Sequence, residues 1–519
     1  MKKASFYLIL FLALAGLVDS AYLTWEHFNN VIPPCTINHF LPILSNCGEV
    51  LRSSYSIIFG IPLALTGIIQ YGLIFIITLL TIYKKNILFC FWLICQAFIG
   101  ALASLYFMYL QIFIIKSICL YCTLSALISF TIFFLAYKKL VKERLTIRFF
   151  LYGFVYQKIL KPIFFLFDAE LIHNFHVDLG ELLGYGFLKK IVGWKFKYIP
   201  PQLKQKLDGI NFSGPIGLAA GFDYDARLTQ ILPSLGFGFQ TVGTVTNSHY
   251  QGNPPPRLGR LPKSKSLMVN KGFKNKGAKI IAEKLNKLDF ETPVGLSIGI
   301  TNSAEIRTIE TGIKDIISAF KIFEKSSVRN SYYELNISCP NLVHTKDIGF
   351  YQPKNLNLLL SAVDKLRLKK PVFIKMPIEK TNQEVFSMID VIVKHKSIKG
   401  VIIGNLQKDR KNSVLVQSEV KKFKVGNFSG KPCEQRSNEL IKLAYKNFKN
   451  KLIIIGCGGV FSAKDAYKKI RLGATLVQLI TGMIFQGPQL ISQINFELVD
   501  LAKRDGFKNI KEAIGYENH

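Results

Sequence analysis

The stretch that decides the fold is "LIIIGCGGVFSAKDAYKKIRLGATLVQLITGMIFQGP", Leu452–Pro488. A short β-branched run ends in glycines, a Lys-rich helical stretch follows, and a second apolar run ends at Thr481 and Gly482. A strand, a helix and a second strand in this order are typical of a parallel sheet with covering helices.

The same unit recurs throughout the second half of the chain. We predict strands at 216–222, 239–246, 294–299, 332–338, 372–376, 401–405, 452–456 and 476–481. Eight parallel-type strands that mostly alternate with helices predict an α/β fold, a (β/α)8 TIM barrel. In that fold, chemistry gathers at the carboxyl ends of the strands.

The first half has a different composition. Four long stretches carry almost no charge: Ala4–Thr24, Ile61–Ile82, Ile87–Leu110 and Cys119–Tyr137. Each can cross a bilayer, which takes about 20 apolar residues. We therefore predict an α-helical membrane bundle of four transmembrane helices over residues 1–140. A secretory signal is the alternative for the first stretch, but it is longer than an ordinary signal core and shows no convincing cleavage site, so we interpret it as retained.

Charge sets the expected topology and partners. Lys and Arg number 66 against 34 Asp and Glu. This excess fits a nucleic-acid binder, a membrane-surface protein or a Lys-rich genome, but the sequence has no basic arm, zinc-finger spacing or RNA-binding signature, so we expect no nucleic-acid partner. Most cations that flank the four stretches fall on one side, which predicts both termini in the cytoplasm.

That topology places two segments outside, Trp25–Gly60 and Lys116–Ile118, on the side that is oxidising in bacteria. Cys35 and Cys47 lie in the first of them, while Cys119 and Cys122 begin the fourth helix as a C-x-x-C motif. Unpaired N–H groups and the helix dipole favour a thiolate at a helix start. The alternatives are a structural disulfide or ordinary buried thiols.

The surroundings of these cysteines narrow the choice. Gly16–Thr24, Cys47–Ser53, Phe59–Gly67 and the C-x-x-C motif stand in an order and spacing that resemble the vitamin K epoxide reductase family in its bacterial form, over about Lys3 to Lys139. The resemblance implies a four-helix bundle that passes electrons from a separate thioredoxin-like thiol protein on the outer side to a quinone.

The resemblance also implies residue roles. Cys119 and Cys122 would be the pair next to the quinone, and Cys35 and Cys47 the loop pair that shuttles electrons to it. Ser53 would donate a hydrogen bond to a quinone oxygen, with a helix cap or turn as its alternative role.

Residues 141–200 form a predicted connector. Aromatic residues are dense there, but Arg148, Lys158, Lys161 and Asp168 interrupt the apolar run, and Pro162 would kink or end a helix. We therefore expect amphipathic, membrane-associated helices and no fifth span. A core helix of the following domain is the alternative.

The ends of the predicted barrel strands are chemically unusual. Asn336, Asn341 and Asn405 would bring side-chain amides to one mouth, which suits a planar ligand with both carbonyl and N–H groups. Gly456–Gly459 and Thr481–Gly482 follow the last two strands, the usual phosphate position of such barrels, where backbone N–H groups can approach without a Cβ in the way.

These strand ends, with Gly217–Gly221, Gly243–Thr246 and Asn427–Pro432, resemble dihydroorotate dehydrogenase. The match runs from the connector to about Ala513 and sets the third domain at 201–519. Within the connector, Phe167–Glu170 and His173 resemble the membrane-associated class that reduces quinone.

The resemblance implies FMN at the barrel mouth, with Lys375 near the flavin ring. Cys339 would be the general base that takes a proton from C5 of dihydroorotate while hydride leaves C6. The implied cofactor-binding residues are Ala219, Ala220, Gly221, Thr244, Asn336, Lys375, Gly430, Gly458, Gly459, Thr481 and Gly482. The implied substrate-binding residues are Asn270, Gly272, Phe273, Asn341 and Asn405.

Some positions depart from the family pattern. Cys339 stands where the quinone class generally carries serine, Tyr224 replaces a lysine, and Ser297 replaces an asparagine that contacts the flavin. We expect Lys271 to supply the lost positive charge. A different cyclic substrate for the barrel is therefore one alternative, and a bundle that serves only as a membrane anchor is another.

Taken together, the sequence predicts a multi-pass protein of the bacterial inner membrane with a cytoplasmic barrel. Its redox cysteines would face the outer side, and its two domains would deliver electrons to the same quinone pool. We predict no metal site.

Overall fold

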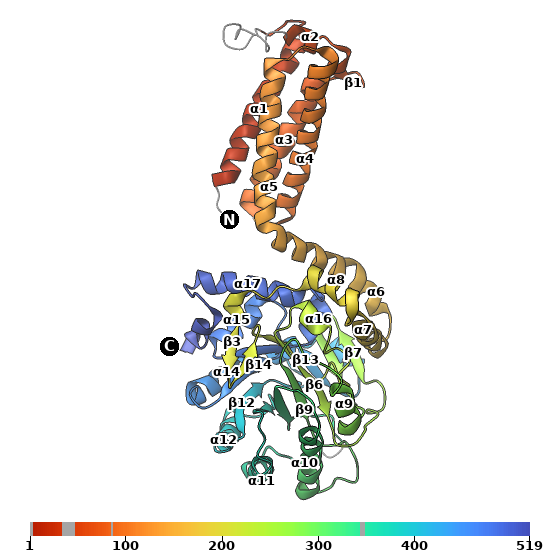
Figure 1. Cartoon of the computed structure of the whole chain (residues 1–519), viewed down its shortest axis with the longest axis vertical. Coiled ribbons are helices and arrows are strands. Elements are labelled where there is room, and N and C mark those ends of the chain that lie inside the picture. Colours follow the sequence, from red (N-terminus) through yellow and green to blue (C-terminus); the bar gives the residue numbers. More distant parts are fainter. Residues whose placement is uncertain (1–3, 34–46, 85–86, 343–347, 519) are drawn as a thin grey trace. The chain divides into compact units, whose positions relative to one another are not determined.

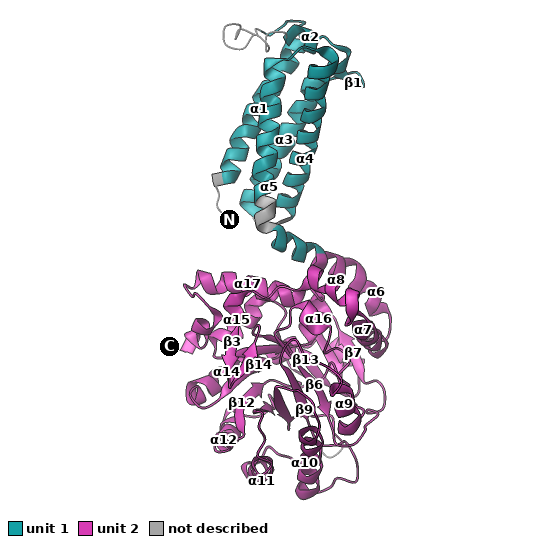
Figure 2. Cartoon of the chain, in the orientation of Figure 1, with its two compact units in different colours: residues 1–151 teal, residues 152–519 magenta. Residues whose placement is uncertain are grey.

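The computed structural model describes residues 4–33, 47–84, 87–342 and 348–518. The chain divides into two compact units, Met1–Leu151 and Tyr152–His519 (Figure 2). The division falls inside the predicted connector 141–200. Each unit has a hydrophobic core of its own.

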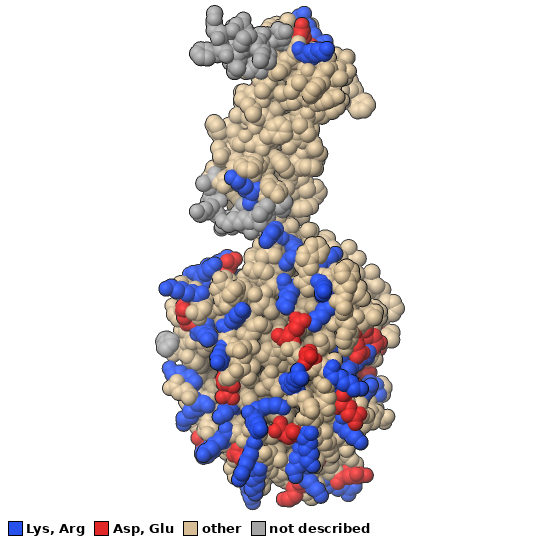
Figure 3. All heavy atoms as spheres, in the orientation of Figure 1, with Lys and Arg blue, Asp and Glu red and all other residues tan. Residues whose placement is uncertain are grey.

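The first unit is a bundle of long helices (Figure 1). These are α1 (Ala4–Phe28), α3 (Leu63–Lys84), α4 (Ile87–Tyr109) and the first part of α5 (Leu120–Val155). A small core that includes Phe6, Tyr71 and Ile132 holds them together. Large apolar side chains also cover the outside, and Figure 3 shows almost no charge along the length of this unit. Helices that are apolar all round belong in lipid, so the predicted helical membrane bundle is confirmed.

The connector differs from our expectation in one respect. Among the described residues, five helices are long and apolar enough to cross a membrane, and the fifth is Arg144–Leu166. We expected its charges to interrupt every window. Its last 18 residues, however, contain only Lys158 and Lys161. Length and composition alone therefore allow a further span here.

The second unit contains a closed barrel of eight parallel strands, as predicted (Figure 1). The order around the barrel is β10-β11-β12-β14-β15-β5-β6-β9. The strands are β5 (Ile216–Leu218), β6 (Phe239–Val245), β9 (Val294–Ile298), β10 (Tyr332–Asn336), β11 (Val372–Met376), β12 (Ile398–Ile403), β14 (Ile453–Cys457) and β15 (Leu476–Leu479).

Helices surround these strands. They include α9 (Ala278–Leu285), α10 (Ile309–Lys325), α11 (Pro353–Asp364), α12 (Asn382–Ile392), α14 (Glu434–Phe448), α15 (Ala463–Arg471) and α17 (Leu490–Arg504). Their apolar faces pack on the strands and form the main core. A second cluster fills the barrel interior with Phe239, Tyr332, Phe373, Ile402 and Ile455. Because apolar side chains close the interior below, the polar site can lie only at the carboxyl ends of the strands.

A small antiparallel sheet, which we did not predict, lies beside the mouth. Its order is β13-β8-β7, with β7 (Leu258–Leu261), β8 (Ser266–Val269) and β13 (Asn427–Gly430). It carries Val269 and Ser429 to the cavity described below.

Three helices precede the barrel strands: α6 (Lys161–Leu166), α7 (Ala169–Leu183) and α8 (Gly186–Phe196). The Asp168 carboxylate caps α7 by accepting hydrogen bonds from the N–H groups of Glu170 and Leu171, both at 2.9 Å. These helices expose large apolar side chains, among them Leu166, Leu182, Phe187 and Trp194.

Candidate active sites

The barrel mouth contains two adjoining cavities of about 130 and 90 Å³. Ala220, Lys375, Asn405 and Thr481 line both of them. These residues come from different strands, and their carboxyl ends meet at one edge because the barrel is parallel. Of the residues predicted for the barrel, every one except Asn270 lines one or both cavities.

The three predicted amides lie in the larger cavity. Ser338 links two of them: Asn405 Nδ2 donates to the Ser338 carbonyl oxygen at 3.2 Å, and the Ser338 N–H donates to Asn336 Oδ1 at 3.3 Å. Asn341 Oδ1 accepts from Asn427 Nδ2 at 2.6 Å. The amides are thus held by the protein and form a polar lining that can receive a planar ligand.

Cys339 lies in the same cavity as Lys375. Burial raises the pKa of its thiol to about 12, although the N–H of Asn341 and the Lys375 and Lys408 cations act in the opposite direction. The thiol is therefore protonated at neutral pH. It can act as a base only if bound ligand brings its pKa down.

The smaller cavity is lined by glycines, including Gly430, Gly458, Gly459 and Gly482. A Cβ on Gly482 would lie 1.9 Å from the Val460 carbonyl oxygen, and one on Gly459 would lie 2.3 Å from Glu434 Cβ. Only glycine therefore allows the close packing of the loops that form this cavity. Such a cavity suits a phosphate group.

The predicted substrate loop lies at the edge of the larger cavity. Gly272 and Phe273 line it. Asn270 does not, and its Oδ1 accepts from Asn253 Nδ2 at 3.0 Å. Asn253 Nδ2 also donates to the Asn341 carbonyl oxygen, at 2.9 Å. Asn270 therefore contacts the site indirectly, through Asn253.

Lys271 and Tyr224 form a stacked pair in this cavity. Lys271 Nζ lies 4.7 Å from the centre of the Tyr224 ring and 3.6 Å from Glu170 on α7. Burial lowers the pKa of Lys271 to about 8. A buried cation therefore lines the site although Tyr224 has replaced the lysine of the family pattern, in keeping with the expected compensation.

The site also contains two functional candidates that we did not name from the sequence. Glu334 lies inside the barrel, 3.6 Å from Lys375 Nζ, and Ser429 lies at the cavity wall, 2.8 Å from the Thr481 hydroxyl. Glu334 could have been noticed as a carboxylate at an inward position of a fully buried strand. Ser429 lies within the Asn427–Pro432 motif, and only the small sheet shows that this residue reaches the cavity.

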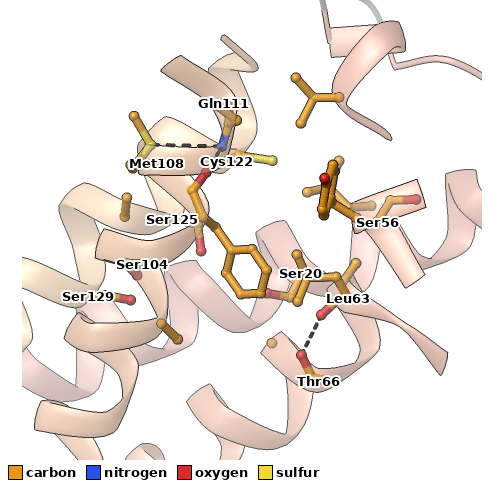
Figure 4. A pocket seen from close by; sticks show the side chains of 18 of the residues that line it. Ser20, Ser56, Leu63, Thr66, Ser104, Met108, Gln111, Cys122, Ser125 and Ser129 are labelled. Atoms are coloured by element: carbon orange, nitrogen blue, oxygen red, sulfur yellow. Dashed lines mark hydrogen bonds between the residues drawn. The ribbon is translucent and has the colours of Figure 1, made fainter. Parts of the chain in front are cut away.

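The helical unit has a cavity of about 360 Å³. Asp19, Ser53, Tyr71, Gln111 and Cys122 are among the residues that line it. Figure 4 shows Ser125 and Ser129 on one side of this cavity, with Leu63 and Thr66 on the other. The size and mostly apolar lining suit a ring-shaped, lipid-soluble ligand.

The cysteines lie beside this cavity. Cys119 and Cys47 are buried in one cluster with Val50, and Cys122 packs against it. The N–H of Cys119 donates to Gln111 Oε1 at 2.9 Å, and Ser117 bonds to Glu49 beside Cys47. Cys119 and Cys122 are free thiols, Cys47 is disulfide-bonded, and Cys35 lies outside the described residues.

Ser53 lines the cavity and also stabilises its own turn. Its hydroxyl donates to the Val50 carbonyl oxygen at 2.8 Å. The turn role that we gave as an alternative is therefore present. Because a hydroxyl has one proton, Ser53 can donate to a quinone oxygen only if it releases the Val50 carbonyl.

The barrel, with a polar site at the carboxyl ends of its strands, has the architecture of (β/α)8 enzymes. Residues 202–501 match the family model for dihydroorotate dehydrogenase, and residues 7–137 match that of the vitamin K epoxide reductase family. The chain belongs to the dihydroorotate dehydrogenase family, and a vitamin K epoxide reductase family domain is fused ahead of the barrel.

Relatives and solved structures agree with this assignment. Dihydroorotate dehydrogenase (quinone) of Trichodesmium erythraeum is 34% identical over 360 residues, which cover 68% of this chain and 89% of that protein. The enzyme of the same name from Nitratiruptor is 35% identical and covers 69% and 98%. The ligand-free DHODH of Eimeria tenella has a TM-score of 0.60 and 26% identity, with coverage of 68% and 100%.

The residues of the barrel mouth fit the FMN that the family implies. The glycine-lined cavity can receive its phosphate, and Lys375 with the neighbouring amides can receive its ring. Among the described residues, no group of three or more His, Cys, Asp or Glu could hold a metal ion.

Proposed function

We propose that the barrel oxidises dihydroorotate to orotate and passes the electrons to a membrane quinone. The observation that carries this proposal is the common cavity of Cys339, Lys375 and three asparagines at the mouth of a family barrel. When bound, FMN supplies the hydride acceptor. Side chains of this protein bind the substrate and remove its proton.

Cys339 takes the proton from C5 of the substrate. Its thiol must first become a thiolate, and the Lys375 and Lys408 cations favour that form. Asn341 and Asn405 bind the carbonyl and N–H groups of the substrate ring, and Gly272 and Phe273 line the cavity beside it. Asn336 lies in the same cavity and belongs to the residues that would hold the cofactor. A fixed set of donors and acceptors of this kind orients the ring for proton removal.

The alternative function for the barrel is oxidation of a different cyclic substrate. Purified full-length protein should reduce ubiquinone with dihydroorotate as electron donor. Reduction only with other cyclic donors would favour the alternative.

We assign a second function to the helical unit, the oxidation of thiols by quinone. The supporting observation is the cluster of Cys47 and Cys119 next to a cavity that Cys122 lines. Two thiols of a separate thioredoxin-like protein become a disulfide, and their two electrons and two protons pass through Cys35 and Cys47, then Cys119 and Cys122, to a quinone that becomes quinol.

The alternative function for the helical unit is that of a membrane anchor with structural disulfides. Cys119→Ala separates the two in a complementation assay of disulfide formation. The thiol-oxidase proposal requires loss of disulfide formation, while an anchor would leave it unchanged. Cys95→Ala, a free thiol away from the cavity lining, is the matched control.

The proposed arrangement has three parts: a membrane bundle at 1–140, membrane-associated connector helices at 141–200 and the barrel at 201–519. With four spans and the connector at the membrane surface, the cations flanking the apolar helices support a position in the bacterial inner membrane with both termini and the barrel in the cytoplasm. The exposed apolar side chains of α6 to α8 support contact of the connector with lipid.

A further inference from the structure

Glu334 is a charged residue in the interior of the barrel. It belongs to β10, its side chain is fully buried, and Oε1 lies 3.6 Å from Lys375 Nζ on the neighbouring strand β11. Oε2 has no hydrogen-bond partner among the described residues. Because a buried carboxylate costs free energy unless it is paired, its presence beneath the site calls for a role.

A chain of hydrogen bonds starts at this carboxylate. The Ser297 hydroxyl on β9 donates to Glu334 Oε1 at 2.6 Å, and Ser297 Oγ lies 2.9 Å from the Thr244 hydroxyl on β6. Thr244 Oγ1 in turn accepts from Asn336 Nδ2 at 2.9 Å. The chain thus crosses three strands and returns to β10, where Glu334 and Asn336 are two residues apart and face the same side.

The direction of every bond in this chain is fixed by its two ends. An ionised carboxylate only accepts, so Ser297 must donate to Glu334, Thr244 must donate to Ser297, and Thr244 can accept only from an amide N–H. At the far end, the Ser338 N–H can only donate and it meets Asn336 Oδ1 at 3.3 Å. Both ends therefore require the same orientation of the Asn336 amide.

We propose that Glu334 is a positioning residue of the barrel site: it orients the Asn336 amide through Ser297 and Thr244, and it sets the charge that Lys375 presents to the flavin. This inference rests on the proposed function. It also gives Ser297 a role, since a hydroxyl can both accept and donate and so can transmit the bond direction between Glu334 and Thr244.

The charge of Glu334 has a direct electrostatic consequence. Lys375 stabilises negative charge that develops on a reduced flavin, and a carboxylate 3.6 Å from its ammonium group offsets part of that effect. Removal of the negative charge should make the bound flavin easier to reduce. The midpoint potential reports this effect, and it is a readout that a purely structural residue would leave unchanged.

The test uses full-length protein in detergent with Glu334→Gln and Ser297→Ala. Glu334→Gln should shift the midpoint potential of bound FMN to more positive values and raise the FMN dissociation constant about tenfold, as expected for disturbing a hydrogen bond to a charged group. Ser297→Ala breaks the chain of hydrogen bonds but keeps the Glu334–Lys375 pair. It should raise the dissociation constant to a similar extent without the positive shift.

Glu324→Gln is the matched control. Glu324 on α10 also pairs with a hydroxyl, that of Tyr333 at 2.6 Å, and with a lysine, Lys370 at 3.7 Å, but it does not line either cavity of the barrel mouth. It should lower thermal stability and leave both flavin properties as in the wild type. If Glu334→Gln behaves like this control, the proposal is overturned.

Two further outcomes remain decisive. If Glu334→Gln does not fold, an unchanged FMN dissociation constant in Ser297→Ala overturns the hydrogen-bond chain, while a raised one supports it. Wild-type protein that binds no FMN would refute the proposed function itself. Wild-type protein that binds FMN, with Glu334→Gln unchanged, would refute only this inference.

Discussion

Cys339 offers the sharpest prediction on the barrel chemistry. Burial raises the pKa of its thiol to about 12. At pH 7 only about one molecule in 10⁵ then carries the thiolate, and this fraction grows tenfold for each pH unit. If the thiolate is the base, the rate of flavin reduction at saturating dihydroorotate should rise about tenfold per pH unit until it levels off at the pKa of the substrate complex.

Cys339→Ala removes the base. Its rate of flavin reduction should fall by about 10²- to 10⁴-fold, the usual contribution of a general base, and should lose the pH dependence. Stopped-flow absorbance of the flavin at a series of pH values measures both effects. Cys95→Ala in the helical unit is the control and should keep the wild-type profile. A Cys339→Ala variant with the wild-type rate, or a wild-type rate that is flat with pH, would refute the assignment.

Three further predictions concern the cofactor, the substrate and the core. Gly482→Ala should abolish FMN retention, because the new Cβ would lie 1.9 Å from the Val460 carbonyl oxygen. Gly349→Ala is the control, since a Cβ at Gly349 meets open space, and this variant should keep the flavin. Equal flavin content in the two variants would contradict the phosphate site. Burial lowers the pKa of Lys271 to about 8, so its side chain is a cation only below that pH. The KM for dihydroorotate should therefore rise above pH 8, and Lys271→Arg should remove the rise. A KM with the same pH dependence in wild type and variant would argue against Lys271 as an anion-binding group. Phe320→Ala should destabilise the barrel by about 3–5 kcal/mol in denaturant unfolding, because the ring is fully buried in the main core; a loss under about 1 kcal/mol would contradict that packing.

The barrel could be predicted from the sequence because its signals are local. Each strand is a short apolar run, and its functional residue stands at or just beyond its carboxyl end. Asn336 is the last residue of β10, and Thr481 lies two residues after β15. Parallel pairing then brings the strand ends together without further information. The helical bundle was predictable for a similar reason, since length and hydropathy decide whether a helix can span a bilayer.

The features that were missed depend on pairing across the fold. Glu334 meets Lys375 and Ser297 only through the register of neighbouring strands, which no local pattern reveals. The small sheet joins β8 to β13, more than a hundred residues along the chain, and its strands are too short to stand out. The stacking of Lys271 on Tyr224 likewise requires two distant loops to meet.

In the proposed function, the barrel takes two electrons from dihydroorotate and gives them to a quinone. Anaerobic titration of the detergent-solubilised full-length protein with dihydroorotate tests it directly through the flavin absorbance. We expect bleaching complete at about one equivalent per flavin, followed by full recovery of the colour when ubiquinone is added. A flavin that stays oxidised with dihydroorotate, or one that bleaches but does not recover with quinone, would contradict the account.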